Sequence, residues 1–482
     1  MIEGTRRRPG PDTGTPPATT RLPDGFRVQV APGVRRLDAG RVLLGAAPIR
    51  LLRLSGKAVD LIAGRSTLRV CDDTTAALAR RLLDTGVAHP RPSGPANAAD
   101  VTVVVPVRDR PDGLNRLLAA VRRGGAAIPV IVVDDGSRDA LAARRVCARH
   151  TATVIRNDIA RGPAAARNAG LVAAATPYVA FFDSDSAPLP GWLDHLQPHL
   201  EDPLVAVAAP RIVAANLGGS GRLASYEEAA SSLDLGPHEG QVHPHGRIPY
   251  VPGVALLVRR AALAGGFDDS MHVAEDVDLV WRLAAAGWRI RYEPKASVRH
   301  EHPTSVMGWA RRRLFYGTGA ADLAARHGSA VAPIVVSPWS AAAWLSLLAG
   351  RLGPVYAAAI LAGATARLAS RLTGVGPRWR LAASLVGTGW LFAGRQLASA
   401  VVRHFWPVSV LVAATGRRTR PWFVLIAVVD AVIGWWPLRR QVRLPTFLLF
   451  RRLDDLSYGG GLWWGAFRSR SLRALVPKIG PA

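Results

Sequence analysis

Two aspartates separated by one residue, Asp183-Ser184-Asp185, come directly after the apolar run Tyr178–Phe182. Residues i and i+2 of an extended segment point to the same side, so both carboxylates face one space. Such a pair of oxygen donors suits Mg²⁺ or Mn²⁺, which binds one or two carboxylates together with substrate phosphates. The bare Asp-x-Asp pattern also fits a turn closed by an Asx hydrogen bond, so its significance comes from the preceding strand and the following Ala-Pro-Leu-Pro turn.

A second acidic group, Asp134-Asp135-Gly136-Ser137, follows another apolar run at residues 130–133. Carboxylates at this point can accept hydrogen bonds from a uracil N–H or a ribose hydroxyl. Ser137 can instead cap the next helix, in which case the group only joins a strand to a helix. The sequence leaves both interpretations open.

Arginines surround the start of a further predicted helix, at Arg161-Gly162-Pro163 and at Arg167. A guanidinium beside a helix N-terminus is well placed to bind a pyrophosphate. An isolated arginine in such a position is otherwise a surface cap, and that alternative stays open.

Three acids begin the helix that includes residues 280–286, in the segment Glu275-Asp276-Val277-Asp278. The helix macrodipole favours acids at this end and accounts for one or two of them. A general base for a sugar hydroxyl is a carboxylate within hydrogen-bond reach of the acceptor oxygen, and Asp276 is the candidate. Further on, His300-Glu301-His302 ends a strand-like stretch, where an imidazole can complete a metal site or serve only a structural role.

The elements around these groups predict an α/β fold. Short β-branched runs, Val101–Val107, 130–133 and Tyr178–Phe182, alternate with helical patterns at 114–121, Ala140–Arg149 and 164–174. Continuous apolar strands alternating with helices predict a parallel sheet covered on both faces. In such sheets ligands bind beyond the carboxyl ends of the strands, and each run here ends in a polar or acidic loop.

The pieces VVVPVRDR, VVDDGSRD, RGPAAARNAG, FFDSDSAPLP and AEDVDLVWRL occur in this order and resemble family 2 glycosyltransferases with the GT-A fold. The resemblance implies a domain over about residues 100–325 that uses a UDP-sugar donor. It implies a donor site formed by Pro106, Arg108, Asp134, Asp135, Arg161, Arg167 and Asp183. It further implies Mg²⁺ or Mn²⁺ on Asp183, Asp185 and either His302 or His300, with Asp276 as the base of an inverting displacement.

One departure from the family concerns the Gln-x-x-Arg-Trp motif of its processive synthases. The comparable region reads Trp309-Ala310-Arg311-Arg312-Arg313, so processive synthesis is not implied. These arginines remain candidates for contacts with phosphates.

The regions on either side of the predicted glycosyltransferase domain indicate which acceptor it uses. Residues 1–23 are predicted to be a disordered lead, 24–90 a small domain and 91–99 a linker. Residues 26–89 resemble the winged-helix, peptide-binding domains of the PqqD type, and the whole layout resembles the glycosyltransferases of mycofactocin systems. That resemblance implies transfer of β-linked glucose from UDP-glucose to a peptide-derived redox cofactor. The alternatives are a membrane-bound transferase for a cell-envelope polysaccharide or glycolipid, and a scaffold whose acidic loops are inert caps.

The C-terminal region, 326–482, is apolar and rich in tryptophan and arginine, with uncharged runs at 331–350, 352–366 and 381–394. A tryptophan belt with basic connectors is typical of helices at a cytoplasmic leaflet, although a soluble helical module fits as well. We therefore expect membrane lipid as a partner and a catalytic domain facing the cytoplasm. The tail from Arg439 is expected to be amphipathic and to lie on the membrane surface.

Charge and cysteine content exclude some classes of function. The net charge of +26 comes from 61 basic residues spread along the chain, and no RNP, zinc-finger or helix-turn-helix pattern accompanies them, so nucleic acid is not an expected partner. The two cysteines, Cys71 and Cys147, are far apart and predict unpaired buried thiols in a reducing compartment.

Overall fold

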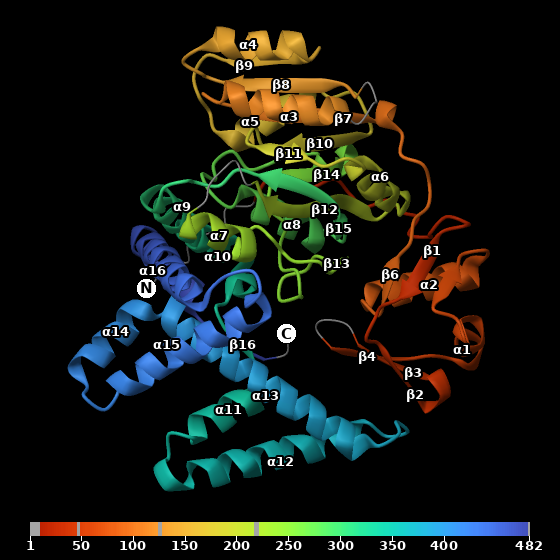
Figure 1. Ribbon diagram of the computed structural model, residues 1–482. Helices are drawn as coiled ribbons and strands as arrows, with labels where there is room; N and C mark the ends of the chain where they lie inside the picture. The colour runs from red at the N-terminus through yellow and green to blue at the C-terminus, as the bar shows by residue number, and fades with distance from the viewer. Residues whose placement is uncertain (1–9, 46–48, 124–127, 216–220, 481–482) are drawn as a thin grey trace, which may run out of the picture. The chain divides into compact units, whose positions relative to one another are not determined.

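The computed structural model describes residues 10–45, 49–123, 128–215 and 221–480. The chain divides into two compact units. The first comprises residues Met1–Val34 and Leu44–Pro303, and the second comprises Arg35–Leu43 and Thr304–Ala482. Figure 1 shows the elements of each unit.

The N-terminal module of the first unit holds a three-stranded antiparallel sheet in the order β5-β1-β6. Its strands are β1 (Arg27–Val30), β5 (Thr67–Arg69) and β6 (Ala88–Pro90). The helices are α1 (Gly56–Ile62) and α2 (Asp73–Asp84). Asp72 caps α2 in a capping box with Thr75, and α2 buries Leu78, Leu82 and Leu83. Short strands β2 (Arg35–Leu37), β3 (Val42–Gly45) and β4 (Arg50–Arg53) follow β1 along the chain.

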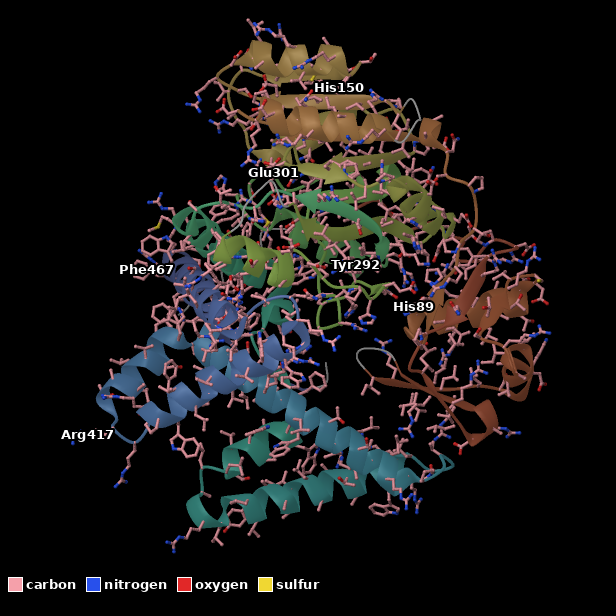
Figure 2. The ribbon with its side chains drawn as sticks, viewed as in Figure 1. His89, His150, Tyr292, Glu301, Arg417 and Phe467 are labelled. Atoms are coloured by element: carbon pink, nitrogen blue, oxygen red, sulfur yellow. The ribbon has the colours of Figure 1, made fainter. Side chains whose placement is uncertain are left out.

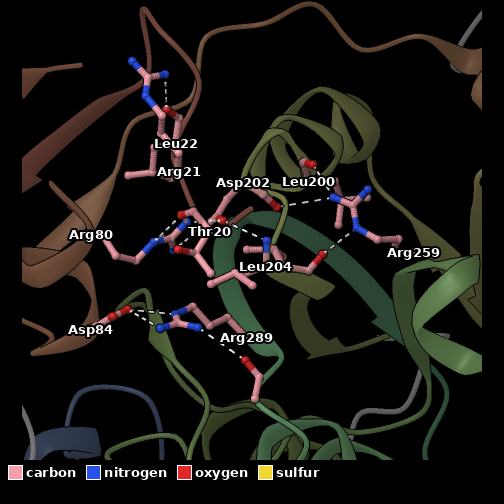
Figure 3. A network of polar contacts seen from close by, with 12 residues as sticks. Thr20, Arg21, Leu22, Arg80, Asp84, Leu200, Asp202, Leu204, Arg259 and Arg289 are labelled. Atoms are coloured by element: carbon pink, nitrogen blue, oxygen red, sulfur yellow. Dashed lines mark hydrogen bonds and ion pairs between the residues drawn. The ribbon is translucent and has the colours of Figure 1, made fainter. Parts of the chain in front are cut away.

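Ion pairs connect this module to the central domain (Figure 3). Arg80 of α2 makes two hydrogen bonds of 2.7 Å to the Asp202 carboxylate, and both side chains are largely buried. Asp84, at the end of α2, accepts from Arg289 at 2.6 Å. The module is therefore held against the central domain by charge-assisted hydrogen bonds at one end of α2.

The central domain is built on a nine-stranded sheet with the order β11-β15-β12-β14-β10-β7-β8-β9, and β13 pairs with β15. The strands are β7 (Val101–Val107), β8 (Val130–Asp135), β9 (Thr153–Asn157), β10 (Tyr178–Phe182), β11 (Ser186–Pro188), β12 (Val205–Ala214), β13 (Gly240–Gln241), β14 (Ala255–Arg259) and β15 (Arg289–His300). The part β10-β7-β8-β9 is parallel, as predicted.

The remaining strands make the sheet mixed, which corrects the expectation of a parallel sheet throughout. β14 lies antiparallel to both of its neighbours, β10 and β12. The sequence does not identify β12 or β14, because periodicity alone does not distinguish a short apolar run in a strand from one in a buried helix.

Helices cover the sheet, and their apolar side chains form a core together with those of the strands. They are α3 (Pro111–Arg123), α4 (Ala140–Arg149), α5 (Pro163–Ala173), α6 (Trp192–Leu196), α7 (Arg222–Ala230) and α8 (Glu275–Ala285). α5 packs against β7 and β8, while α6 and α8 pack against β15. Leu114, Leu117 and Leu118 of α3 are fully buried in one core with the valines of β7. Burying this apolar face fixes the strand ends, from which the acidic loops emerge.

The second unit is helical. Its helices are α9 (Val306–Thr318), α10 (Ala320–His327), α11 (Pro338–Ser346), α12 (Gly353–Arg371), α13 (Arg378–Arg403), α14 (Trp406–Thr415), α15 (Arg420–Trp435) and α16 (Leu444–Arg468), and the short strands β16 (Val335–Val336) and β17 (Lys478–Ile479) pair with each other. The spans Gly350–Arg371 and Arg420–Leu438 are long and apolar enough to cross a membrane. α13 and α14 pass the same test as a pair bent by 80°.

The uncharged run 331–350 contains the strand β16 and the helix α11, which begins at a proline. Two sequence expectations for residues outside the site need correction. The tail from Arg439 does not lie on the surface throughout, since α16 buries Phe447, Asp454 and Asp455 and packs against α9. Of the two free thiols, Cys147 is buried but Cys71 is exposed.

Candidate active site

The Asp183-Ser184-Asp185 loop leaves the end of β10 and turns at once into β11. Asp183 N donates to Val254 O at 2.9 Å, and Ser186 N donates to Asp183 O at 3.0 Å. β11 then pairs with β15, with Ser186 opposite His300. The apolar strand and this tight turn therefore hold both carboxylates at the carboxyl end of the sheet.

Asp185 lies between a guanidinium and an imidazole. Arg110 Nη1 donates to Asp185 Oδ2 at 2.8 Å, and His300 Nε2 lies 3.3 Å from Asp185 Oδ1. His300 is buried, whereas His302 is partly exposed and its ring nitrogen faces the carbonyl of Pro303 at 3.4 Å. The strand pairing thus brings His300, rather than His302, to the acidic loop.

Arg167 is not a surface cap, because its side chain is buried between two carboxylates. It donates to Asp183 Oδ1 at 2.7 Å and to Glu275 Oε1 at 2.8 Å, and its guanidinium lies 5.3 Å from the ring centre of Phe267. Burial lowers the pKa of Arg167, but the charges of Asp183 and Glu275 outweigh it and raise this pKa above its usual value. The arginine therefore stays charged and connects the acidic loop to the start of α8.

Asp276 is held by backbone N–H groups at the first turn of α8. Gly253 N donates to Asp276 Oδ2 at 2.6 Å, and Val277 N donates to Oδ1 at 2.8 Å. Burial and the neighbouring charge of Glu275 raise the pKa of Asp276 to about 6. A carboxylate with such a pKa is a stronger base than an exposed aspartate and is still ionised at neutral pH.

Gly253 allows this arrangement because it has no side chain. A Cβ added there would lie 3.0 Å from Asp276 Cβ and 3.5 Å from Arg167 Nη2. The backbone before β14 therefore approaches both the candidate base and the buried arginine, which places the two in one site.

The carboxylates of Asp183 and Asp185 fit a divalent cation whose remaining ligands come from a diphosphate. Burial raises the pKa of Asp183, Arg167 opposes this shift, and the neighbouring Asp185 charge adds to it. A cation between the carboxylates would relieve their repulsion. Across the described parts of the chain, no three His, Cys, Asp or Glu side chains gather as a complete metal site, so phosphate oxygens would have to supply the other ligands.

The residues predicted for the nucleoside lie at the ends of β7 and β8, where Val107 pairs with Asp134. Pro106 is buried and Arg108 is exposed. Asp134, 1% exposed, accepts from Ser137 N at 3.0 Å and from Arg156 Nη1 at 2.5 Å. Ser137 is not the cap of the next helix, because Asp139 is the N-cap of α4 and accepts from Ala142 N at 3.0 Å. Ser137 Oγ instead accepts from Asp109 N at 3.0 Å, and contact of Asp134 with a nucleoside stays a prediction.

Asp135 joins β8 to the loop before α5. It accepts from Arg161 N at 2.9 Å and from Gly162 N at 2.8 Å, and Gly162 has the positive φ of 94° that glycine adopts readily. The side chain of Arg161 is exposed and lies 3.9 Å from Asp269. Asp135 therefore fixes the backbone of this loop and does not bind the Arg161 guanidinium.

Sequence reasoning missed several residues that shape the site, chiefly Arg110, Arg156, Gly113 and Gly253. Arg110 follows the end of β7 within the piece VVVPVRDR, so its place in that loop could have identified it. Gly113 gave no signal, yet a Cβ there would lie 2.6 Å from Ser184 O. Its role depends entirely on how α3 packs against the acidic loop.

Comparison with known proteins points to one family of enzymes. Residues 102–267 match the family described as Glycosyl transferase family 2. The succinoglycan biosynthesis protein ExoU of Rhizobium meliloti (strain 1021) is 28% identical over 209 residues, 41% of this chain and 60% of its own. A mannosyltransferase from Pyrobaculum calidifontis, solved with GDP-Man and Mn²⁺, is 21% identical and covers 72% of this chain and 91% of its own, with a TM-score of 0.37.

A much closer relative covers nearly the whole chain. The pre-mycofactocin glycosyltransferase of Mycobacterium tuberculosis, in strains CDC 1551 and H37Rv, is 46% identical over 475 residues, 95% of this chain and 99% of its own. The α/β GT-A fold and the glycosyltransferase activity expected from the sequence are therefore confirmed. The chain belongs to the mycofactocin glycosyltransferases of family 2.

Proposed function

We propose that this enzyme transfers glucose from UDP-glucose to a precursor of mycofactocin, a peptide-derived redox cofactor, and forms β-linked glucose units. The observation that carries the proposal is the position of Asp276. Its carboxylate is held by Gly253 N beside Arg167, which in turn binds Asp183 of the acidic loop. These contacts support a site in which Asp276 is the base and the acidic loop binds the diphosphate.

The proposed reaction is a single displacement. Asp276 accepts the proton of the acceptor hydroxyl, whose oxygen attacks the anomeric carbon on the face opposite to UDP. The bond from that carbon to the diphosphate breaks as the new bond forms, so the configuration inverts. Because the pKa of Asp276 is raised to about 6, the carboxylate takes up this proton more readily than an exposed aspartate.

Asp183 and Asp185 would hold the Mg²⁺ or Mn²⁺, and His300 is a further ligand candidate because it contacts Asp185. Such an ion, when bound, neutralises the charge that develops on the leaving diphosphate. Arg110 and Arg167 bring two more positive charges to the same loop. On the donor side, Pro106, Arg108, Asp134 and Asp135 would line the nucleoside, and Arg161 would lie near the phosphates.

The acceptor is proposed from the relative and from the domain layout. The Mycobacterium tuberculosis protein is named for pre-mycofactocin and aligns with 95% of this chain, which leaves too few residues unaligned to omit the N-terminal module. We propose that this module, residues 24–90, is a PqqD-like domain that binds the peptide part of the acceptor. Residues 100–325 would form the catalytic domain and residues 326–482 the membrane-associated region.

Apolar surface on the helical unit supports a location at the cell membrane, with the catalytic domain facing the cytoplasm. α14 and α15 expose large apolar side chains: Val408, Leu411, Val412, Trp422, Val424, Leu425 and Val428. Arg417 extends from the loop between these helices (Figure 2). An apolar face with tryptophan and flanking arginine suits contact with the acyl chains and anionic headgroups of a membrane.

Purified protein incubated with radiolabelled UDP-glucose, Mn²⁺ and the mycofactocin precursor tests the function. We expect a labelled product that a β-glucosidase cleaves and an α-glucosidase does not. Asp276→Asn should abolish transfer and leave UDP binding intact, while Asp194→Asn, an exposed carboxylate on α6, should behave as wild type. Transfer only to a lipid or polysaccharide acceptor would instead support a role in cell-envelope synthesis.

A further inference from the structure

The N-terminal lead, residues 10–22, is bound to the central domain in this structure, although the sequence predicts disorder for it. Gly14 N donates to Ala262 O at 3.0 Å, and Gly265 N donates to Asp12 O at 2.8 Å. Two side chains of the central domain also donate to the lead. Trp288 Nε1 donates to Gly14 O at 2.6 Å, and Arg282 Nη1 donates to Pro11 O at 2.8 Å.

The lead packs so closely against the central domain that no side chain fits at Gly14 or at Gly265. A Cβ on Gly14 would lie 1.9 Å from Ala261 O, and one on Gly265 would lie 2.5 Å from Asp12 O. The end of the lead is fixed as well, because Leu22 is fully buried and Arg80 donates to Thr20 O at 2.8 Å (Figure 3). Backbone contacts this close are made by a segment that belongs to the fold.

One of these contacts leads to the helix that carries the candidate base. Arg282 lies in the last turn of α8, which begins with Glu275 and Asp276. Besides Pro11 O, Arg282 binds the fully buried Asp278 at 2.7 Å and Gly266 O at 2.9 Å. A single guanidinium therefore joins the lead, α8 and the loop at residues 264–267.

The loop at residues 264–267 also contacts α5, the helix that carries Arg167. Phe267 N donates to Asn168 Oδ1 and Asn168 Nδ2 donates to Phe267 O, each at 2.8 Å. Arg167, the neighbour of Asn168, lies over the Phe267 ring and binds Asp183. The lead thus contacts both the helix that presents Asp276 and the loop against which Arg167 packs.

We propose that the lead is a positioning segment for catalysis, which holds α8 and the loop at residues 264–267 so that Asp276 stays beside Arg167. Gly14, Trp288 and Arg282 are its positioning residues, and none of them needs to touch substrate. The inference rests on the proposed role of Asp276 as the base. Small displacements of a catalytic group reduce the rate strongly, whereas donor binding by the acidic loop depends less on α8.

The test compares full-length variants that disturb the lead to different degrees. Gly14→Val places a side chain against Ala261 O, and Trp288→Phe removes one donor but keeps an aromatic ring. Thr15→Val is the matched control, because it adds an apolar branched side chain at the exposed neighbouring position. For each variant, kcat is measured from pH 5 to 9, and UDP binding is measured by calorimetry.

We expect Gly14→Val to lower kcat about tenfold and Trp288→Phe about threefold, with the Kd for UDP within about twofold of wild type. Both should move the acid limb of the kcat profile to lower pH, because Asp276 gains water as α8 shifts. Thr15→Val should match wild type.

Wild-type kcat in both variants, or a loss of kcat without movement of the acid limb, would overturn the inference. If Gly14→Val does not fold, the kcat of Trp288→Phe and the position of its acid limb test the inference alone. Asp276→Asn, assayed in parallel, separates the two ideas: transfer by that variant contradicts the base assignment itself, whereas wild-type behaviour of the lead variants contradicts only the positioning role.

Discussion

Arg167 donates to Asp183 over 2.7 Å, so one oxygen of a carboxylate that the sequence assigns to a metal ion is already bound to a buried cation. The same guanidinium binds Glu275 at 2.8 Å. Two carboxylates therefore share one arginine within a largely buried site. Removing that charge would leave both acids without their main counter-charge, which makes Arg167 important to folding.

Arg167→Gln should lower the free energy of unfolding by about 3–5 kcal/mol, because it leaves buried carboxylates uncompensated. Arg161→Gln should change it by less than about 1 kcal/mol, since the Arg161 side chain is 65% exposed. Denaturant unfolding of both variants measures the difference. Equal stabilities would contradict the account of Arg167 as the central counter-charge.

Asp276→Asn should inactivate the enzyme and yet stabilise it. A folded pKa of about 6, above the usual 3.8, means that the native state binds this proton more tightly than the unfolded chain does. Ionisation of Asp276 therefore costs stability above about pH 6, and the cost disappears as the pH falls through 6 toward 4. The asparagine avoids it, so we expect about 1–3 kcal/mol more stability at pH 7.5 and no gain at pH 4. Thermal melts at the two pH values check the sign.

The transfer rate should fall as the medium is acidified through about pH 6, because protonated Asp276 cannot accept the acceptor proton. The profile of kcat for the wild-type enzyme measures this limb. A rate that stays constant down to pH 4.5 would exclude Asp276 as the base.

His300→Gln should raise the Mn²⁺ concentration needed for half-maximal transfer by about 10–100-fold, because His300 contacts Asp185. His302→Gln is the matched control and should leave that concentration within about twofold of wild type, since its ring faces the Pro303 carbonyl. A metal titration of both variants measures the effect. The reverse pattern would assign the metal role to His302.

Gly113→Ala should reduce kcat by about 10–100-fold, because its Cβ would lie 2.6 Å from Ser184 O and would push the acidic loop away from its position. Gly56→Ala, at the start of α1, meets nothing within 4 Å and should have wild-type activity. Steady-state kinetics of the two variants compare them directly. Full activity of Gly113→Ala would show that the loop tolerates displacement.

The sequence by itself determined several of the strands and helices around the site. The apolar runs Val101–Val107 and Tyr178–Phe182 and the helix Ala140–Arg149 form with the predicted bounds. These elements are predictable because each is set by local periodicity and ends where polar residues begin. The motifs around the acidic loops, taken in their order along the chain, also sufficed to identify the family.

Only the tertiary structure decided which side chains meet. The pairing of Ser186 with His300 places that histidine, rather than His302, beside Asp185. The burial of Arg167 between Asp183 and Glu275 joins residues up to 108 positions apart. The lead is held by residues far from it in sequence, such as Trp288, whose Nε1 donates to Gly14 O across 274 residues. Such contacts depend on strand register and packing across the whole unit, which no local pattern encodes.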